Sequence, residues 1–158
     1  MDKHVNTHID LDSFWPFHVV VLADQITRHT LSIVKDEAEL NSSQWRVLAA
    51  IADKPGRTAA EVVTITPMDK TIVSRAVSSL INTGLIKKTL SQTDKRRSAL
   101  QITQTGLNIY QKIAARINKT MITALLEDNE GGKNEAEDFI KIIRKFSAKM
   151  ASTTPHSD

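Results

Sequence analysis

Apolar residues recur every three or four positions along most of the chain, a period typical of amphipathic helices. Between two of the expected helices, the pattern changes to short stretches typical of β-strands. The expected helices span about residues 14–34, 41–53, 58–64, 70–84, 106–126 and 134–151, and the expected strands span residues 85–90 and 98–103. The pattern therefore predicts a mainly α fold with a small β-hairpin (α+β), in which residues 91–97 form the hairpin loop.

Polar residues and glycine mark where several of these helices begin and end. Asn41 with Gln44, and Thr58 with Glu61, have the spacing of a capping box. The helix at 70–84 has two candidate caps, Thr66 and Asp69, and the need for a turn between two close helices favours Asp69. A glycine at residue 84 suits the left-handed position that follows a helix. Two helices joined by a tight turn and followed by a hairpin predict a winged helix-turn-helix.

Length and composition narrow the class of protein. The 158 residues predict one domain, or a small domain with a dimerisation element. There is no run of about 18 apolar residues to span a membrane, and the N-terminus lacks the layout of a signal peptide, so we expect a cytoplasmic protein. The chain has no cysteine, which excludes disulfides and thiolate zinc sites.

Motifs for catalysis and for metal binding are weak. The sequence has no glycine-rich phosphate loop and no His-Glu-x-x-His or Gly-x-Ser-x-Gly motif, so an enzyme is not expected. His4 and His8 are four residues apart, but a specific metal site needs at least three converging ligands. We therefore expect neither a metal nor another cofactor.

Basic residues concentrate in the middle of the chain. Residues 42–104 contain ten bases and four acids, a net charge of +6, whereas the rest contains eleven bases and fourteen acids, a net charge of −3. A basic centre between acidic ends predicts a surface that faces a polyanion, although a solvated basic face would give the same count. Together with the helix-turn-helix order, the charge favours double-stranded DNA as the partner.

The polar start of the 70–84 helix carries the candidate reading residues. A helix that enters the major groove needs hydrogen-bond donors on its solvent side, and Arg75 is suited to bidentate contact with guanine. Hydroxyl groups suit phosphates or base edges. The candidate residues on this helix are Asp69, Lys70, Thr71, Ser74 and Arg75.

In the hairpin loop, three basic residues follow one acidic residue. Repulsion between the three positive charges should disfavour this arrangement unless an external anion compensates. A narrow minor groove attracts an inserted arginine, so we expect Arg96, at or near the tip, to enter it. Asp94 is expected to shape the loop. Lys95 and Arg97 are expected to contact the flanking phosphates.

Three stretches, LNSSQWRVLAAI, MDKTIVSRAVSSLINTGLI and TDKRRSALQITQTG, resemble in order and spacing the MarR (multiple antibiotic resistance regulator) family of winged-helix transcription factors. The resemblance spans about residues 14–150 and implies that Asp94 and Arg96 are the characteristic pair of the wing. It also implies that the recognition helix is residues 69–84. Pro67 departs from the family pattern, because many relatives have glycine in that turn, so the turn's backbone is expected to differ locally.

The resemblance further implies a homodimer built from the first and the last two helices. The sequence supports a dimer independently, since these helices carry more apolar surface than a 60-residue winged module can cover. The expected organisation is an N-terminal tail (1–13), a helical dimerisation region (14–40 and 104–151), a winged helix-turn-helix (41–103) and a C-terminal tail (152–158). Such a dimer matches a pseudo-palindromic operator.

Relatives in this family often bind small aromatic acids, so the resemblance implies an effector pocket. The candidate lining residues are Trp15, Phe17, His18 and Trp45. Core packing is the favoured alternative for Trp45, and packing in a dimer core is the favoured alternative for the other three. The expected function is a ligand-responsive, homodimeric, DNA-binding regulator, most simply a repressor. The alternative is a winged-helix protein-interaction module without DNA binding. The operator, the effector and the regulated genes are not readable from the sequence.

Overall fold

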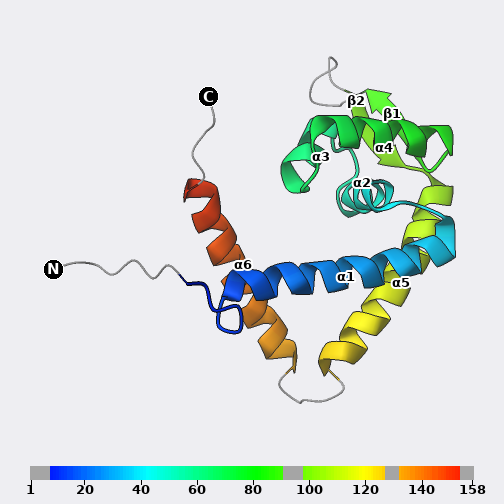
Figure 1. The fold of residues 1–158 in the computed structure, drawn as a ribbon. Helices are drawn as coiled ribbons and strands as arrows, with labels where there is room; N and C mark the ends of the chain where they lie inside the picture. Colours follow the sequence, from blue (N-terminus) through cyan, green and yellow to red (C-terminus); the bar gives the residue numbers. More distant parts are fainter. Residues whose placement is uncertain (1–7, 91–97, 127–131, 154–158) are drawn as a thin grey trace. The chain divides into compact units, whose positions relative to one another are not determined.

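A computed structural model describes residues 8–90, 98–126 and 132–153 of the chain (Figure 1). These residues form six α-helices and one two-stranded antiparallel sheet, which confirms the predicted mainly α fold. The residues divide into two compact units, 1–114 and 115–158. The elements are α1 (Trp15–Ala38), α2 (Ser42–Asp53), α3 (Ala59–Ile65), α4 (Lys70–Asn82), β1 (Ile86–Leu90), β2 (Ser98–Ile102), α5 (Gln104–Leu126) and α6 (Gly132–Thr153).

The winged helix-turn-helix has one apolar core. Helix α4 packs against α2 and α3, while the hairpin packs against α2 and α4. Burial of these apolar side chains stabilises the unit by removing hydrocarbon from water. Its fully buried members come from every element of the motif: Val47, Leu48 and Ile51 in α2, Val62 in α3, Val73 and Leu80 in α4, and Ile86 and Leu100 in the hairpin.

The predicted helix caps form as hydrogen bonds. Asn41 Oδ1 accepts from the Gln44 N–H at 2.9 Å, and Thr58 Oγ1 accepts from the Glu61 N–H at 3.3 Å. Asp69, rather than Thr66, caps α4, because Asp69 Oδ1 accepts from the Ile72 N–H at 2.8 Å. The recognition helix therefore begins at Lys70, and the preceding turn separates it from α3.

The end of α4 determines where the wing starts. Gly84 has φ +73°, and its N–H donates to the Ile81 carbonyl at 2.9 Å. The Leu85 N–H donates to the Leu80 carbonyl at 2.9 Å, so the pair forms a Schellman motif, as the glycine predicted. Strand β1 follows at once, and the hairpin register pairs Ile86 with Ile102 and Leu90 with Ser98.

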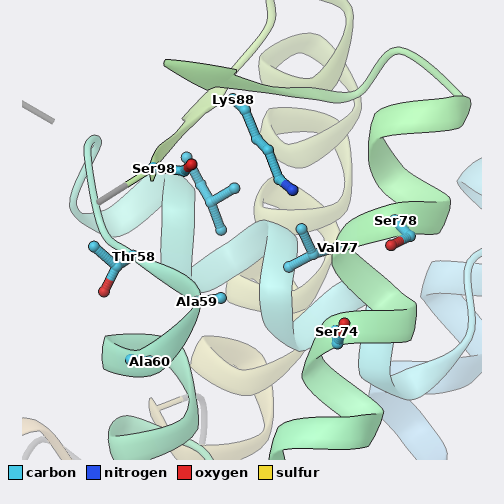
Figure 2. Close-up of a pocket in the computed structure, with 9 residues that line it drawn as sticks. Thr58, Ala59, Ala60, Ser74, Val77, Ser78, Lys88 and Ser98 are labelled. Atoms are coloured by element: carbon cyan, nitrogen blue, oxygen red, sulfur yellow. The ribbon is translucent and has the colours of Figure 1, made fainter. Parts of the chain in front are cut away.

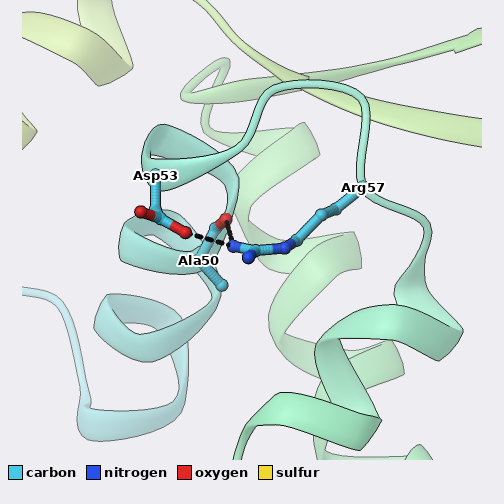
Figure 3. Close-up of polar contacts among 3 residues, drawn as sticks. All are labelled: Ala50, Asp53 and Arg57. Carbon is cyan, nitrogen blue, oxygen red and sulfur yellow. Dashed lines mark hydrogen bonds and ion pairs between the residues drawn. The ribbon is translucent and has the colours of Figure 1, made fainter.

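The loop between α2 and α3 pairs with β2. The Gly56 N–H donates to the Leu100 carbonyl at 2.9 Å, and the Leu100 N–H donates to the Arg57 carbonyl at 2.8 Å. The Arg57 guanidinium turns back to the end of α2, where it donates to the Ala50 carbonyl and pairs with the Asp53 carboxylate at 2.9 Å (Figure 3). A cation at a helix C-terminus is favoured by the last free carbonyls. Arg57 thus ties the end of α2 to the loop beside the wing.

Two details of the helices differ from the pattern. The first helix was expected to end at about residue 34, but α1 continues to Ala38, and its C-cap Glu39 has a φ of +52°. Ile72 of α4 is apolar, but its side chain is 42% exposed. It lines the groove between α4 and the first turn of α2.

Helices α1 and α6 expose many large apolar side chains. On α1 these include Val19, Val20, Val21, Leu22 and Ile26, and on α6 they include Phe139, Ile140, Ile142 and Ile143. Neither helix, nor any other helix among the described residues, has the length and apolar content needed to cross a bilayer. α1 and α6 are therefore amphipathic helices that expose large apolar side chains.

Candidate DNA-binding surface

The exposed face of α4 is polar and basic. Val73, Ala76, Val77 and Leu80 are buried and hold the helix to the core, so the opposite face is turned to solvent. Every predicted reading residue after the cap lies on exposed positions of this helix: Lys70, Thr71, Ser74 and Arg75. Ser78, which the sequence reasoning did not single out, is exposed one turn after Ser74. The carboxylate of Asp69 is occupied by the cap, which places this candidate in a structural contact.

A groove runs along one side of α4, where it meets the start of α2. Its volume is about 370 Å³, and Arg75 and Ile72 line it from α4. Asn41, Ser43 and Gln44 line it from the first turn of α2. Because N–H groups at a helix start favour anions, this side of the helix suits a DNA backbone that passes the recognition helix.

A second groove lies on the other side of α4, beneath the hairpin (Figure 2). It measures about 440 Å³, and its lining includes Thr58, Ala59 and Ala60 near the start of α3, Ser74 and Ser78 on α4, and Lys88 and Ser98 on the hairpin. The Lys88 side chain extends from β1 toward α4 in the figure. Lys87 and Lys88 are both exposed, so the stem of the wing adds positive charge beside the recognition helix.

The four wing candidates lie outside the described residues. Asp94, Lys95, Arg96 and Arg97 belong to the hairpin loop, 91–97, whose ends are fixed by the pairing of Leu90 with Ser98. Their roles at the minor groove stay predictions.

One carboxyl of the surface has a shifted pKa. Hydrogen bonds from the backbone N–H and the hydroxyl of Thr58 hold the pKa of Glu61 below its ordinary value of 4.5, because they stabilise the carboxylate. The N–H and the hydroxyl lie 2.7 and 2.9 Å from Glu61 Oε2. Glu61 thus remains ionised as a cap of α3, a structural role without catalytic chemistry.

A smaller cavity lies between α1 and α2. Its volume is about 240 Å³, and its walls combine apolar, hydroxyl, aromatic and cationic side chains. They are Ile26, Thr27, Thr30, Leu31, Ser42, Trp45 and Arg46. The Trp45 ring stacks on Tyr110 of α5, with ring centroids 5.7 Å apart and an interplanar angle of 22°. Arg46 gives this cavity a positive charge.

The other three predicted effector residues lie elsewhere on α1. Trp15, Phe17 and His18 occupy its exposed first turns and do not line the cavity that contains Trp45. Phe17 and His18 meet edge to face at 5.8 Å, and His18 Nε2 lies 2.9 Å from the Asp12 carbonyl. The structure therefore does not bring the four candidates together in one cavity. No group of three or more His, Asp or Glu side chains among residues 8–90, 98–126 and 132–153 is arranged to hold a metal.

The fold and this surface define a winged helix-turn-helix protein. Comparison with known proteins agrees: residues 39–97 match the model of the MarR family. The transcriptional regulator HosA of Escherichia coli O157:H7 is 27% identical over 122 residues, which cover 75% of this chain and 86% of HosA. The chain is therefore similar to MarR-family regulators over its winged part and to the transcriptional regulator HosA over three quarters of its length.

Solved structures show the same fold. A MarR/EmrR family regulator from Acinetobacter sp. ADP1 superposes with a TM-score of 0.75 at 20% identity, covering 89% of this chain and 99% of that one. The regulator PcaV of Streptomyces coelicolor, solved in complex with its natural ligand, has a TM-score of 0.63 at 27% identity and covers 90% of this chain and 97% of its own. These matches extend the likeness well beyond the winged part into the terminal helices.

Proposed function

We propose that this protein is a homodimeric, ligand-responsive repressor that binds double-stranded DNA in the cytoplasm. The observation that carries the proposal is the exposed polar and basic face of α4, which lies opposite the buried stripe that holds the helix to the core. In this reading α4 enters the major groove. Arg75 contacts a guanine edge, while Thr71 and Ser74 contact base edges or phosphates.

The wing extends the same contact along the duplex. Lys88 of the stem, beside α4, faces the backbone, Arg96 enters the minor groove, and Lys95 and Arg97 neutralise the phosphates beside it. Because each neutralised phosphate releases counterions, binding weakens steeply as salt rises. Asp94 shapes the loop by accepting hydrogen bonds within it.

The exposed apolar residues of α1 and α6 support dimerisation through residues 14–40 and 104–151. A soluble monomer rarely leaves large apolar patches in water. Two-fold symmetry then presents two recognition helices to a pseudo-palindromic operator, with half-sites roughly 34–36 Å apart, one turn of the duplex.

The cavity between α1 and α2 suits a small aromatic anion as effector. Trp45 offers an aromatic wall, and Arg46 offers the charge that a carboxylate needs. The relative PcaV binds a ligand, as its structure reports. An effector that binds this cavity better in one state of the dimer than in the other shifts the population between them, and thereby the affinity for DNA.

The proposal is tested by selecting sequences from a random duplex library of roughly 30 base pairs, long enough for two half-sites one turn apart. Fluorescence anisotropy of the selected duplex then gives affinity across a salt series. We expect a two-fold symmetric consensus and a steep fall of affinity with salt. Failure to enrich any sequence, with no binding at low salt, would reject DNA binding and favour a winged-helix protein-interaction module.

A further inference from the structure

The side chain of Gln44 is held at both ends of its amide. Its Oε1 accepts from the Asn41 N–H at 2.8 Å, which completes the capping box of α2. Its Nε2 donates to Ser79 Oγ at 2.7 Å, in a part-buried contact with a residue 35 positions further along the chain. The same amide therefore closes the first turn of α2 and contacts the recognition helix.

Ser79 lies on the flank of α4 that carries Arg75. It follows Arg75 by four positions, one helical turn, so the two side chains lie one above the other on the same side of the helix. Ser79, Arg75 and Gln44 all line the groove between α4 and the start of α2. A shift of α4 that breaks the Gln44–Ser79 bond would also move Arg75 relative to α2.

Apolar packing alone does not define this relation sharply. The buried residues of α4 attach it to α2 by apolar contacts, which are non-directional. A hydrogen bond requires a short distance and a narrow angle. The Gln44–Ser79 bond therefore adds a directional restraint on the orientation of α4.

We propose that Gln44 is a positioning residue for DNA recognition, which holds Ser79 and so maintains the orientation in which α4 presents Thr71 and Arg75. This inference rests on the proposed DNA binding. Without the bond, the competent orientation is only one of several populated by the free protein. The apparent affinity for DNA then falls in proportion to the fraction of the protein that remains in the competent orientation.

A double-mutant cycle tests the pair. Gln44→Ala, Ser79→Ala and the double variant are compared with wild type by anisotropy on the selected duplex, under conditions where circular dichroism shows each variant folded. A single net hydrogen bond predicts that each substitution weakens binding by roughly twofold to tenfold. The double variant should bind no more weakly than the weaker single variant, because both remove the same interaction.

Two further variants separate positioning from stability. Gln44→Ala also removes a capping contact and lowers stability, whereas Ser79→Ala leaves the capping box intact. Ser79→Thr keeps the hydroxyl and should restore wild-type affinity. The dependence of affinity on salt should stay unchanged in Ser79→Ala, because no phosphate contact is removed.

The matched control is the other capping box. Glu61 is the equivalent residue at the start of α3, and among the described residues its carboxylate accepts hydrogen bonds only from Thr58, within that box. Glu61→Ala and Ser79→Ala should therefore act independently, with multiplying effects on affinity. Wild-type affinity in Ser79→Ala, or independent effects of Gln44→Ala and Ser79→Ala, would overturn the positioning role alone. A wild-type protein that binds no duplex would overturn the proposed function as well.

Discussion

Gly106 lies directly against the backbone carbonyl of Leu85, with no room for a side chain between them. A Cβ on Gly106 would overlap the Leu85 oxygen and approach the carbonyl carbon of Leu85 to 2.9 Å and Ile102 Cγ1 to 3.0 Å. The Thr103 hydroxyl strengthens the junction by donating to the Gly84 carbonyl at 2.7 Å and accepting from the Gly106 N–H at 3.1 Å. The start of α5 is thus fastened to the turn between α4 and β1.

The first prediction is that Gly106→Ala destabilises the fold strongly. Backbone atoms cannot move aside as a flexible side chain does, so overpacking should lower the free energy of unfolding by about 3 kcal/mol. The control is Gly56→Ala, because a Cβ there meets nothing within 4 Å and only the φ of +91° opposes it. That control should cost about 1–2 kcal/mol. Urea unfolding at one fixed protein concentration measures both, and equal costs would contradict the steric argument.

The second prediction concerns pH and Glu61. The folded pKa of Glu61 is lowered, so the unfolded state binds the proton more readily, and ionised Glu61 favours folding. This contribution is present above the ordinary value of 4.5 and is lost as pH falls through the lowered folded pKa. Glu61→Gln, which keeps a capping oxygen without the charge, should therefore melt below wild type near neutral pH. The melting temperatures of wild type and Glu61→Gln should converge in acid. A difference between them that does not change with pH would contradict a stabilising role for ionised Glu61.

The third prediction distinguishes a residue of α4 that contacts a base from one that neutralises a phosphate. Arg75→Ala should cost roughly 1–3 kcal/mol of discrimination on the selected duplex and relax the sequence preference at one base pair. Lys70→Ala should weaken binding to all sequences similarly and reduce the salt slope by about one. Anisotropy on the selected duplex and on single-base variants distinguishes the two. The same pattern in both variants would mean that Arg75 reads no base.

The fourth prediction concerns the wing. If Arg96 enters the minor groove and Lys95 only faces phosphate, Arg96→Ala should weaken binding more than Lys95→Ala. Both substitutions remove one positive charge, so net charge is matched between the two variants. Replacing A·T pairs beside the half-site by G·C widens the minor groove and should weaken wild type more than Arg96→Ala. An equal response of the two proteins would place Arg96 outside the groove.

The fifth prediction addresses the dimer. Ile143 is 43% exposed on the apolar side of α6, so Ile143→Glu should weaken self-association by placing a charge in the interface. Lys145→Glu, on the same helix, introduces the same side chain among charged neighbours and should leave association unchanged. Sedimentation velocity across a concentration series measures both variants. A monomeric wild type would remove the basis of the prediction.

Local hydrogen bonds are what the sequence by itself determined. Capping residues act on an N–H three positions away, so the pairs at Asn41 and Thr58 and the cap at Asp69 were predictable within one turn. The glycine after α4 and the two strands followed from equally local rules. The order of these elements, with the family resemblance, was enough to predict the winged helix-turn-helix.

Only the tertiary structure decided which side chains meet across elements. The exposure of Ile72 depends on how the first turn of α2 lies beside α4, and the separation of Trp45 from Trp15, Phe17 and His18 depends on the path of α1. Gln44 was predictable as a cap, but its bond to Ser79 joins residues 35 positions apart. The contact of Gly106 with Leu85 is of the same kind. Periodicity specifies which face of a helix is apolar, whereas packing alone determines the neighbour that each edge residue meets.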